Sequence, residues 1–125
     1  MKIRMYYHHT DCGGVVYYSN YLDFLEEART ELLEKKGAGV KEMMKEGVFF
    51  VVARQEIDYK SPSFYGDTLE IDTRITNIGA AKVNFEYEVN NQDNRLIASA
   101  KTILVCVGKD LKPQAVPERI RQLIS

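Results

Sequence analysis

The sequence has no long apolar run, no marked excess of charge of one sign and few cysteines or histidines among its 125 residues. No stretch approaches the ~20 consecutive apolar residues that a membrane-spanning helix requires. The formal net charge of -1 gives no reason to expect a nucleic acid or an anionic membrane surface as a partner. We therefore expect neither a membrane span nor a nucleic-acid partner.

The N-terminal residues MKIRMYYHH contain no apolar segment of the kind found in signal peptides. Only two cysteines are present, Cys12 and Cys106, and nothing in their spacing calls for a disulfide. Both features favour a cytoplasmic protein with reduced thiols. Apolar residues make up 45% of the chain and no segment is of low complexity, so we expect one domain over residues 1–125.

One long amphipathic helix is predicted over residues 20–36, with Asn20 as its N-terminal cap and Gly37 ending it. A short strand is expected before it, over residues 2–8, where apolar and more polar residues alternate. The apolar stripe of the helix is formed by residues at helical spacing, namely Tyr21, Leu22, Phe24, Leu25, Ala28, Leu32 and Leu33.

After a short helical segment over residues 40–46, the apolar period changes to two, which indicates strands at 48–59, 69–76, 83–89 and 96–107. Pro117 is expected in the first turn of a short C-terminal helix. Four consecutive strands favour an antiparallel sheet, and only one long helix is available to cover it. The predicted fold is α+β, with a curved antiparallel sheet wrapped around one central helix.

The final strand is apolar on both faces, which suggests that part of the outer surface is covered as well. An exposed edge strand also invites pairing with a second chain. We therefore expect a homodimer or a homotetramer.

The segment before the helix combines Asp11 with Gly13 and Gly14. These residue types are typical of a tight turn, because aspartate bonds its own backbone and glycine adopts positive φ. They also suit a site, because a carboxylate would lie close to the free N–H groups of a helix N-terminus. Such a pair can activate water and stabilise an oxyanion in acyl transfer. The residues alone leave both interpretations open.

The segment DCGGVVYYSNYLDFLEEAR, which starts at Asp11, resembles the signature of hotdog-fold acyl-CoA thioesterases. This family includes 4-hydroxybenzoyl-CoA thioesterase and the Tol–Pal-associated enzymes. A second segment, IDYKSPSFYGDTLEI, is similar to the part of the family sequence that enters the next strand. The resemblance implies a hotdog fold and hydrolysis of acyl-CoA thioesters, with coenzyme A as the carrier half of the substrate and no further cofactor.

By position, the resemblance implies that Asp11 is the nucleophile or general base and that the backbone N–H of Tyr18 polarises the thioester carbonyl. The tyrosine at position 18 matches the hydroxybenzoyl branch and favours short or aromatic acyl groups. The positions implied to bind substrate are Tyr7, Gly14, Val16, Tyr17, Lys60 and Ser61.

The chain departs from the family where arginines commonly flank the proline, since Ser61 and Phe64 stand there. Lys60 or Lys82 is then a candidate for the coenzyme A phosphates. Two other functions remain open. A hydratase or dehydratase acting on acyl thioesters would need a histidine near the helix, and the chain has only His8 and His9. A non-catalytic acyl-CoA-binding or scaffold domain would bind without turnover.

A metal site is not expected, although His8, His9, Asp11 and Cys12 are close in sequence. Neighbouring residues on a strand point to opposite faces, so these four side chains do not converge easily on one ion.

Overall fold

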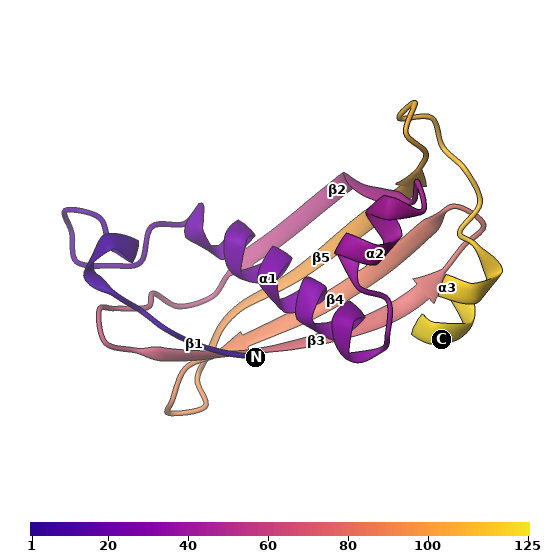
Figure 1. Ribbon diagram of the computed structural model, residues 1–125. Helices are drawn as coiled ribbons and strands as arrows, with labels where there is room; N and C mark the ends of the chain where they lie inside the picture. The colour runs from indigo at the N-terminus through magenta and orange to yellow at the C-terminus, as the bar shows by residue number, and fades with distance from the viewer.

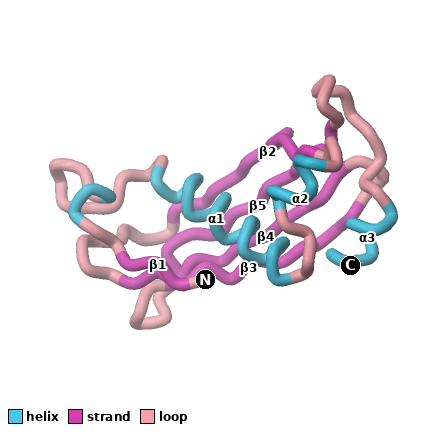
Figure 2. The backbone as a smooth tube through the Cα atoms, viewed as in Figure 1, coloured by secondary structure: helices cyan, strands magenta, loops and turns pink.

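A five-stranded antiparallel sheet carries the long helix α1 along one face, as Figures 1 and 2 show. The structure is a computed structural model that describes residues 1–125. The predicted α+β class, with strands curved around one long helix, is confirmed. None of the helices is long and apolar enough to cross a membrane. The elements are β1 (Lys2–Arg4), a 3₁₀ turn (Tyr7–His9), α1 (Asn20–Lys35), α2 (Val40–Lys45), β2 (Phe49–Tyr59), β3 (Thr68–Ile78), β4 (Lys82–Asn90), β5 (Leu96–Val107) and α3 (Glu118–Ile124).

The strands lie in the order β1-β3-β4-β5-β2. Strands β3, β4 and β5 follow one another as antiparallel neighbours, whereas β2 lies on the far side of β5. β5 is therefore an interior strand, which accounts for its apolar residues without a second chain. The two edge strands are β1, which has only three residues, and the long strand β2, where Val51 and Val52 are 41% and 51% exposed.

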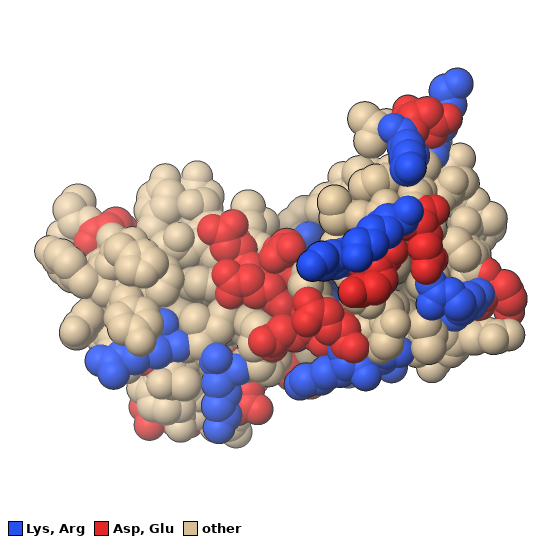
Figure 3. Space-filling view, viewed as in Figure 1, with Lys and Arg blue, Asp and Glu red and all other residues tan.

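The core lies between α1 and the sheet, with Phe85 and Tyr87 of β4 among its largest buried side chains. Two residues of the predicted helical stripe differ from expectation, because Leu32 is only partly buried and Leu22 is 45% exposed. Figure 3 shows acidic side chains gathered over the middle of this face of the molecule, where α1 lies. The helix residues buried as predicted are Tyr21, Phe24, Leu25, Ala28 and Leu33.

The ends of three elements also differ from the predictions. The first strand stops at Arg4, and a 3₁₀ turn replaces the rest of the segment expected to reach His8. Asn20 does not cap α1; it is the first helical residue, and its side-chain amide donates to the carbonyl of His9 at 2.7 Å. Pro117 is the residue before α3 rather than within its first turn.

Candidate active site

The predicted site residues lie at one end of the molecule, where three loops meet beyond the sheet (Figure 1). The loop from residue 5 to residue 19 joins β1 to α1 and carries most of them. The second loop, residues 60–67, follows β2, and the bridge between Val15 and Phe64 joins it to the first. The third is the turn between β4 and β5, and no sequence pattern indicated that this turn lies near the site.

Asp11 starts a tight turn and also presents a free carboxylate oxygen. Its Oδ1 accepts a hydrogen bond from the backbone N–H of Gly13 at 2.8 Å, and its carbonyl accepts one from Gly14 at 3.1 Å. Its Oδ2 has no intramolecular partner, and the side chain is exposed. The turn and site interpretations of Asp11 are therefore compatible with each other.

The two glycines serve this turn in different ways. A Cβ atom on Gly13 would lie 3.2 Å from Oδ1 of Asp11, which is tighter than ordinary contact. Gly14 has φ of +85°, and no atom lies within 4 Å of the position that a Cβ would occupy. The space beside Gly14 is therefore open, and its backbone conformation favours glycine.

Tyr18 has a backbone N–H that makes no hydrogen bond within the chain. The preceding N–H, that of Tyr17, donates to the carbonyl of His9 at 2.8 Å. This bond and the bridge between Thr10 and Val16 fold the loop into a narrow hairpin, with Asp11 in its turn and Tyr18 at its exit towards α1. The free N–H of Tyr18 lies two residues before the first residue of the helix, where the macrodipole favours negative charge.

Tyr59, at the end of β2, fixes this exit and was not singled out from the sequence. Its hydroxyl donates to the carbonyl of Tyr18 at 3.1 Å, and the two rings meet edge to face with centroids 6.3 Å apart. Burial, followed by the neighbouring Tyr18, raises the pKa of Tyr59. Only the tertiary fold shows this contact, because the two tyrosines are 41 residues apart.

The other predicted substrate-binding positions fall in different surroundings. Tyr7 is 81% exposed and stands edge to face with Tyr65. Tyr17 is exposed, and the neighbouring side chain of Tyr18 is the main cause of its raised pKa. Val16, by contrast, is buried in the core, and its N–H donates to the carbonyl of Ser63 at 2.8 Å. Its side chain lies behind the exposed surface rather than on it.

Lys60 and Ser61 follow β2 directly, at the same end of the molecule. The side chain of Lys60 is exposed and forms no ion pair, whereas the hydroxyl of Ser61 accepts a hydrogen bond from Nε of Arg95 at 3.1 Å. Lys82 lies at the opposite end of the sheet, at the start of β4 and opposite Val105. Within one chain, Lys60 rather than Lys82 therefore lies at the end that carries the candidate site.

The histidines contribute to packing at this end of the molecule. Nδ1 of His9 accepts a hydrogen bond from the N–H of Tyr6 at 2.9 Å, and its ring packs edge to face against Phe24. Burial, and then the neighbouring His8, lowers the pKa of His9. No group of three or more His, Cys, Asp or Glu side chains is arranged to hold a metal ion.

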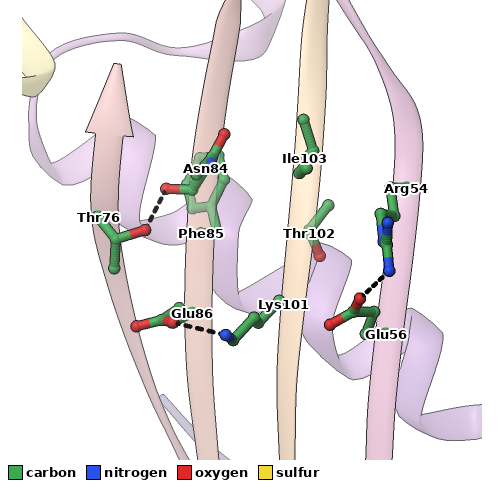
Figure 4. Close-up of a pocket in the computed structure, with 9 residues that line it drawn as sticks. All are labelled: Arg54, Glu56, Thr76, Asn84, Phe85, Glu86, Lys101, Thr102 and Ile103. Carbon is green, nitrogen blue, oxygen red and sulfur yellow. Dashed lines mark hydrogen bonds and ion pairs between the residues drawn. The ribbon is translucent and has the colours of Figure 1, made fainter. Parts of the chain in front are cut away.

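Two hollows in the surface lie elsewhere. The larger, of about 350 Å³, is on the outer face of the sheet (Figure 4). Its charged side chains are paired with one another, Arg54 with Glu56 and Lys101 with Glu86. The second, of about 190 Å³, lies among α1, α2 and β2 and is mostly apolar. Neither contains Asp11 or Tyr18.

Comparison with known proteins identifies the family to which this chain belongs. The family model of the thioesterase-like superfamily matches residues 7–124. The acyl-CoA thioester hydrolase YbgC of Escherichia coli O6:H1 is 39% identical over 119 residues, which are 94% of this chain and 89% of YbgC.

Solved structures share the fold. Protein TT1821 from Thermus thermophilus has a TM-score of 0.94 and 29% identity, covering 99% of this chain and 95% of that one. Slr0204 from Synechocystis, a 1,4-dihydroxy-2-naphthoyl-CoA thioesterase, has a TM-score of 0.91 and 25% identity, covering 99% and 93%. These likenesses confirm the hotdog fold and the family resemblance predicted from the sequence. Because the family model spans nearly the whole chain, this protein belongs to the thioesterase-like superfamily.

Proposed function

We propose that this chain hydrolyses acyl-CoA thioesters at the end of the molecule that carries Asp11 and Tyr18. The observation that carries the proposal is a pair of unpartnered groups on one hairpin, Oδ2 of Asp11 and the N–H of Tyr18. Open space beside Gly14 leaves room for a substrate. The substrate class is supported by the names of the relatives, which include an acyl-CoA thioester hydrolase at 39% identity.

In one route, Asp11 acts as a general base. It takes a proton from water while the water oxygen bonds to the thioester carbonyl carbon. The N–H of Tyr18 stabilises the oxyanion that forms, and the carbon–sulfur bond then breaks to release the coenzyme A thiolate, which is protonated. In the other route the carboxylate of Asp11 attacks the carbon itself, expels the thiolate and leaves a mixed anhydride that water hydrolyses. Both routes are hydrolyses, so neither requires a redox cofactor.

The proposal includes a homo-oligomer that pairs β2 with β2 of a second copy. The exposed edge of β2 and its apolar residues Val51 and Val52 support this pairing. A two-fold axis makes two such strands antiparallel, so the Tyr59 end of one strand lies beside the Phe49 end of the other. The apolar hollow of about 190 Å³ is at the Phe49 end, which brings it towards the partner's catalytic hairpin.

This arrangement gives the acyl group a place to bind. Apolar side chains from four elements line the hollow, including Met43 and Met44 of α2 and Phe49 of β2. Methionine is flexible and adapts to ligands of different shape. The acyl group is proposed to leave the catalytic hairpin of one subunit and enter the hollow of its partner.

We place this activity in the cytoplasm. Cys12 and Cys106 are both free thiols, one exposed and one buried, as is usual in a reducing compartment.

The first test is the release of free thiol from a panel of acyl-CoA esters that carry short aliphatic, long aliphatic and aromatic acyl groups. Turnover of one or more esters above the uncatalysed rate supports the proposal. Tight binding of acyl-CoA by calorimetry without any turnover would instead identify a non-catalytic binding domain and contradict it.

A further inference from the structure

We infer that His9 is a positioning residue for the catalytic hairpin, and that its neutral imidazole is the form that holds the hairpin in place. The inference rests on the function proposed above, because it concerns the hairpin that carries Asp11 and Tyr18. His9 acts through other groups: its side chain fixes the 3₁₀ turn before the hairpin, and its carbonyl connects the hairpin to the start of α1.

The imidazole of His9 fixes the 3₁₀ turn. Its Nδ1 accepts a hydrogen bond from the N–H of Tyr6 at 2.9 Å, and the N–H of His9 donates to the carbonyl of Tyr6 at 3.0 Å. An imidazole nitrogen accepts a hydrogen bond only when it carries no proton, so this contact requires a neutral ring with its hydrogen on Nε2. The ring also packs edge to face against Phe24 of α1, with centroids 5.3 Å apart. The neutral ring is therefore held from both sides.

The carbonyl of His9 organises the hairpin and the start of the helix together. It accepts from the N–H of Tyr17 at 2.8 Å and from the side-chain amide of Asn20 at 2.7 Å. The first bond closes the hairpin directly before Tyr18, and the second attaches the first residue of α1. A carbonyl oxygen has two lone pairs, so it can accept both bonds. A movement of His9 is therefore passed on to the N–H of Tyr18 and to the start of the helix.

Protonation of Nδ1 removes this support. A protonated Nδ1 is a donor that faces the N–H donor of Tyr6, so the hydrogen bond between them is lost. The ring of His8 lies with its centroid 4.0 Å from that of His9, so two positive charges would be close together. Burial, and then the neighbouring His8, lowers the pKa of His9. The folded protein thus favours the neutral form of His9.

No carboxylate offsets a positive charge on His9. Neither histidine forms an ion pair with an aspartate or glutamate. The α1 side chains that contact His9 are uncharged, and Asp23 on the same helix is exposed. Asp11 directs one carboxylate oxygen into its own turn. On the side of β1, Arg4 lies over the ring of Tyr6, 5.4 Å from its centroid, and adds further positive charge. We therefore expect the hairpin to loosen as the pH falls and His9 is protonated.

The first test is the pH dependence of kcat for the wild type, His9→Asn and His9→Ala. The side-chain oxygen of asparagine can take the place of Nδ1 and accepts a hydrogen bond at any of these pH values. We expect His9→Asn to keep kcat within about twofold of the wild type at pH 8 and to hold this rate to a lower pH. His9→Ala has no acceptor, so its kcat at pH 8 should be up to about tenfold lower.

His8→Asn is the matched control, because it removes the adjacent, exposed histidine. Its kcat at pH 8 should equal that of the wild type. Its rate should begin to fall at a higher pH than in the wild type, because loss of a like charge raises the pKa of His9. If His9→Ala keeps the wild-type rate at pH 8, or if His9→Asn loses its rate over the same pH range as the wild type, His9 does not position the hairpin.

A second measurement does not depend on hydrolysis. Amide hydrogen exchange followed by NMR gives the protection of the Tyr17 N–H, which donates to the carbonyl of His9. Relative to an unstructured amide at the same pH, this protection should fall about tenfold as His9 is protonated in the wild type, and it should stay constant over that range in His9→Asn. If the wild type hydrolyses no thioester, the proposed function fails, and the exchange result still decides the role of His9. The same pH dependence in both proteins overturns the inference.

Discussion

At the scale of single residues, the geometry of Asp11 is compatible with both the turn and the proposed catalytic role, which the sequence presented as alternatives. One carboxylate oxygen closes the turn with Gly13, and the other is free for chemistry. A turn of this kind holds the side chain in one orientation, which a catalytic group requires. The sequence predicted both features but not their coexistence, because the residue types of a turn do not reveal which oxygen is occupied.

Tyr59 gives the first prediction at this scale. Tyr59→Phe removes the hydrogen bond to the carbonyl of Tyr18 and leaves the ring contacts in place. We expect the exit of the hairpin to be held less firmly, so that kcat falls by up to roughly tenfold while the free energy of unfolding changes by about 1 kcal/mol or less. Steady-state kinetics and urea unfolding measure the two effects.

Tyr65→Phe is the matched control, because its ring is exposed at the same end and its hydroxyl makes no hydrogen bond. An unchanged kcat in Tyr59→Phe would show that the contact with Tyr18 plays no part in the reaction.

Other contacts at this end of the molecule could not be predicted from local patterns. Arg95 follows a turn rich in asparagine, and its bond to Ser61 joins residues 34 positions apart. Val16 belongs to the family signature, yet its side chain is buried. A signature marks positions that recur together, and it does not separate those that touch a substrate from those that pack behind it.

At the scale of elements, the periodicity of apolar residues predicted α1 and β5 nearly to the residue. It did not predict the 3₁₀ turn at Tyr7–His9, because Met5 and Tyr7 continue the alternation of β1. The periodicity also did not predict that β2 lies beside β5. Pairing between strands far apart in the chain depends on the whole core, whereas an alternating pattern reports only which face of a strand is buried.

Two consecutive side-chain hydrogen bonds join three strands. The hydroxyl of Tyr87 on β4 donates to Oγ1 of Thr102 on β5 at 2.9 Å, and Thr102 donates to Oε1 of Gln55 on β2 at 2.6 Å. Thr102 is 1% exposed. Loss of its hydroxyl would leave the hydroxyl of Tyr87 without an acceptor and Gln55 without a donor.

We therefore predict that Thr102→Val, which preserves shape, lowers the free energy of unfolding by about 2 kcal/mol. Urea denaturation of the purified protein measures this loss. Tyr87→Phe should cost less, because the bond between Thr102 and Gln55 survives. If Thr102→Val is as stable as the wild type, these two hydrogen bonds do not stabilise the sheet.

At the scale of the whole molecule, the exposed edge of β2 leads to the prediction of an oligomer. Val52→Lys places a charge on that edge, where a valine is now 51% exposed. We expect the wild type to have the mass of a dimer or a multiple of it, and the variant to shift towards the monomer. Light scattering after size-exclusion chromatography measures both masses.

Gln122→Lys on α3 is the control, since it adds the same charge to an exposed position away from β2. Thioesterase activity should fall together with the oligomer in Val52→Lys, because in the proposed arrangement the acyl group enters the partner's hollow. A monomeric wild type, or a monomeric variant with full activity, would contradict the shared site.

The most direct test of the account is the rate of thiol release by Asp11→Asn on the best acyl-CoA substrate of the wild type. Asparagine keeps the oxygen that accepts from Gly13, so the turn and the fold should survive, while the charge is lost. We predict that kcat falls by at least about 100-fold, whereas Asp93→Asn, at the same end of the molecule, changes it little. If Asp11→Asn stays folded and retains the wild-type rate, Asp11 serves only the turn and the catalytic account is wrong.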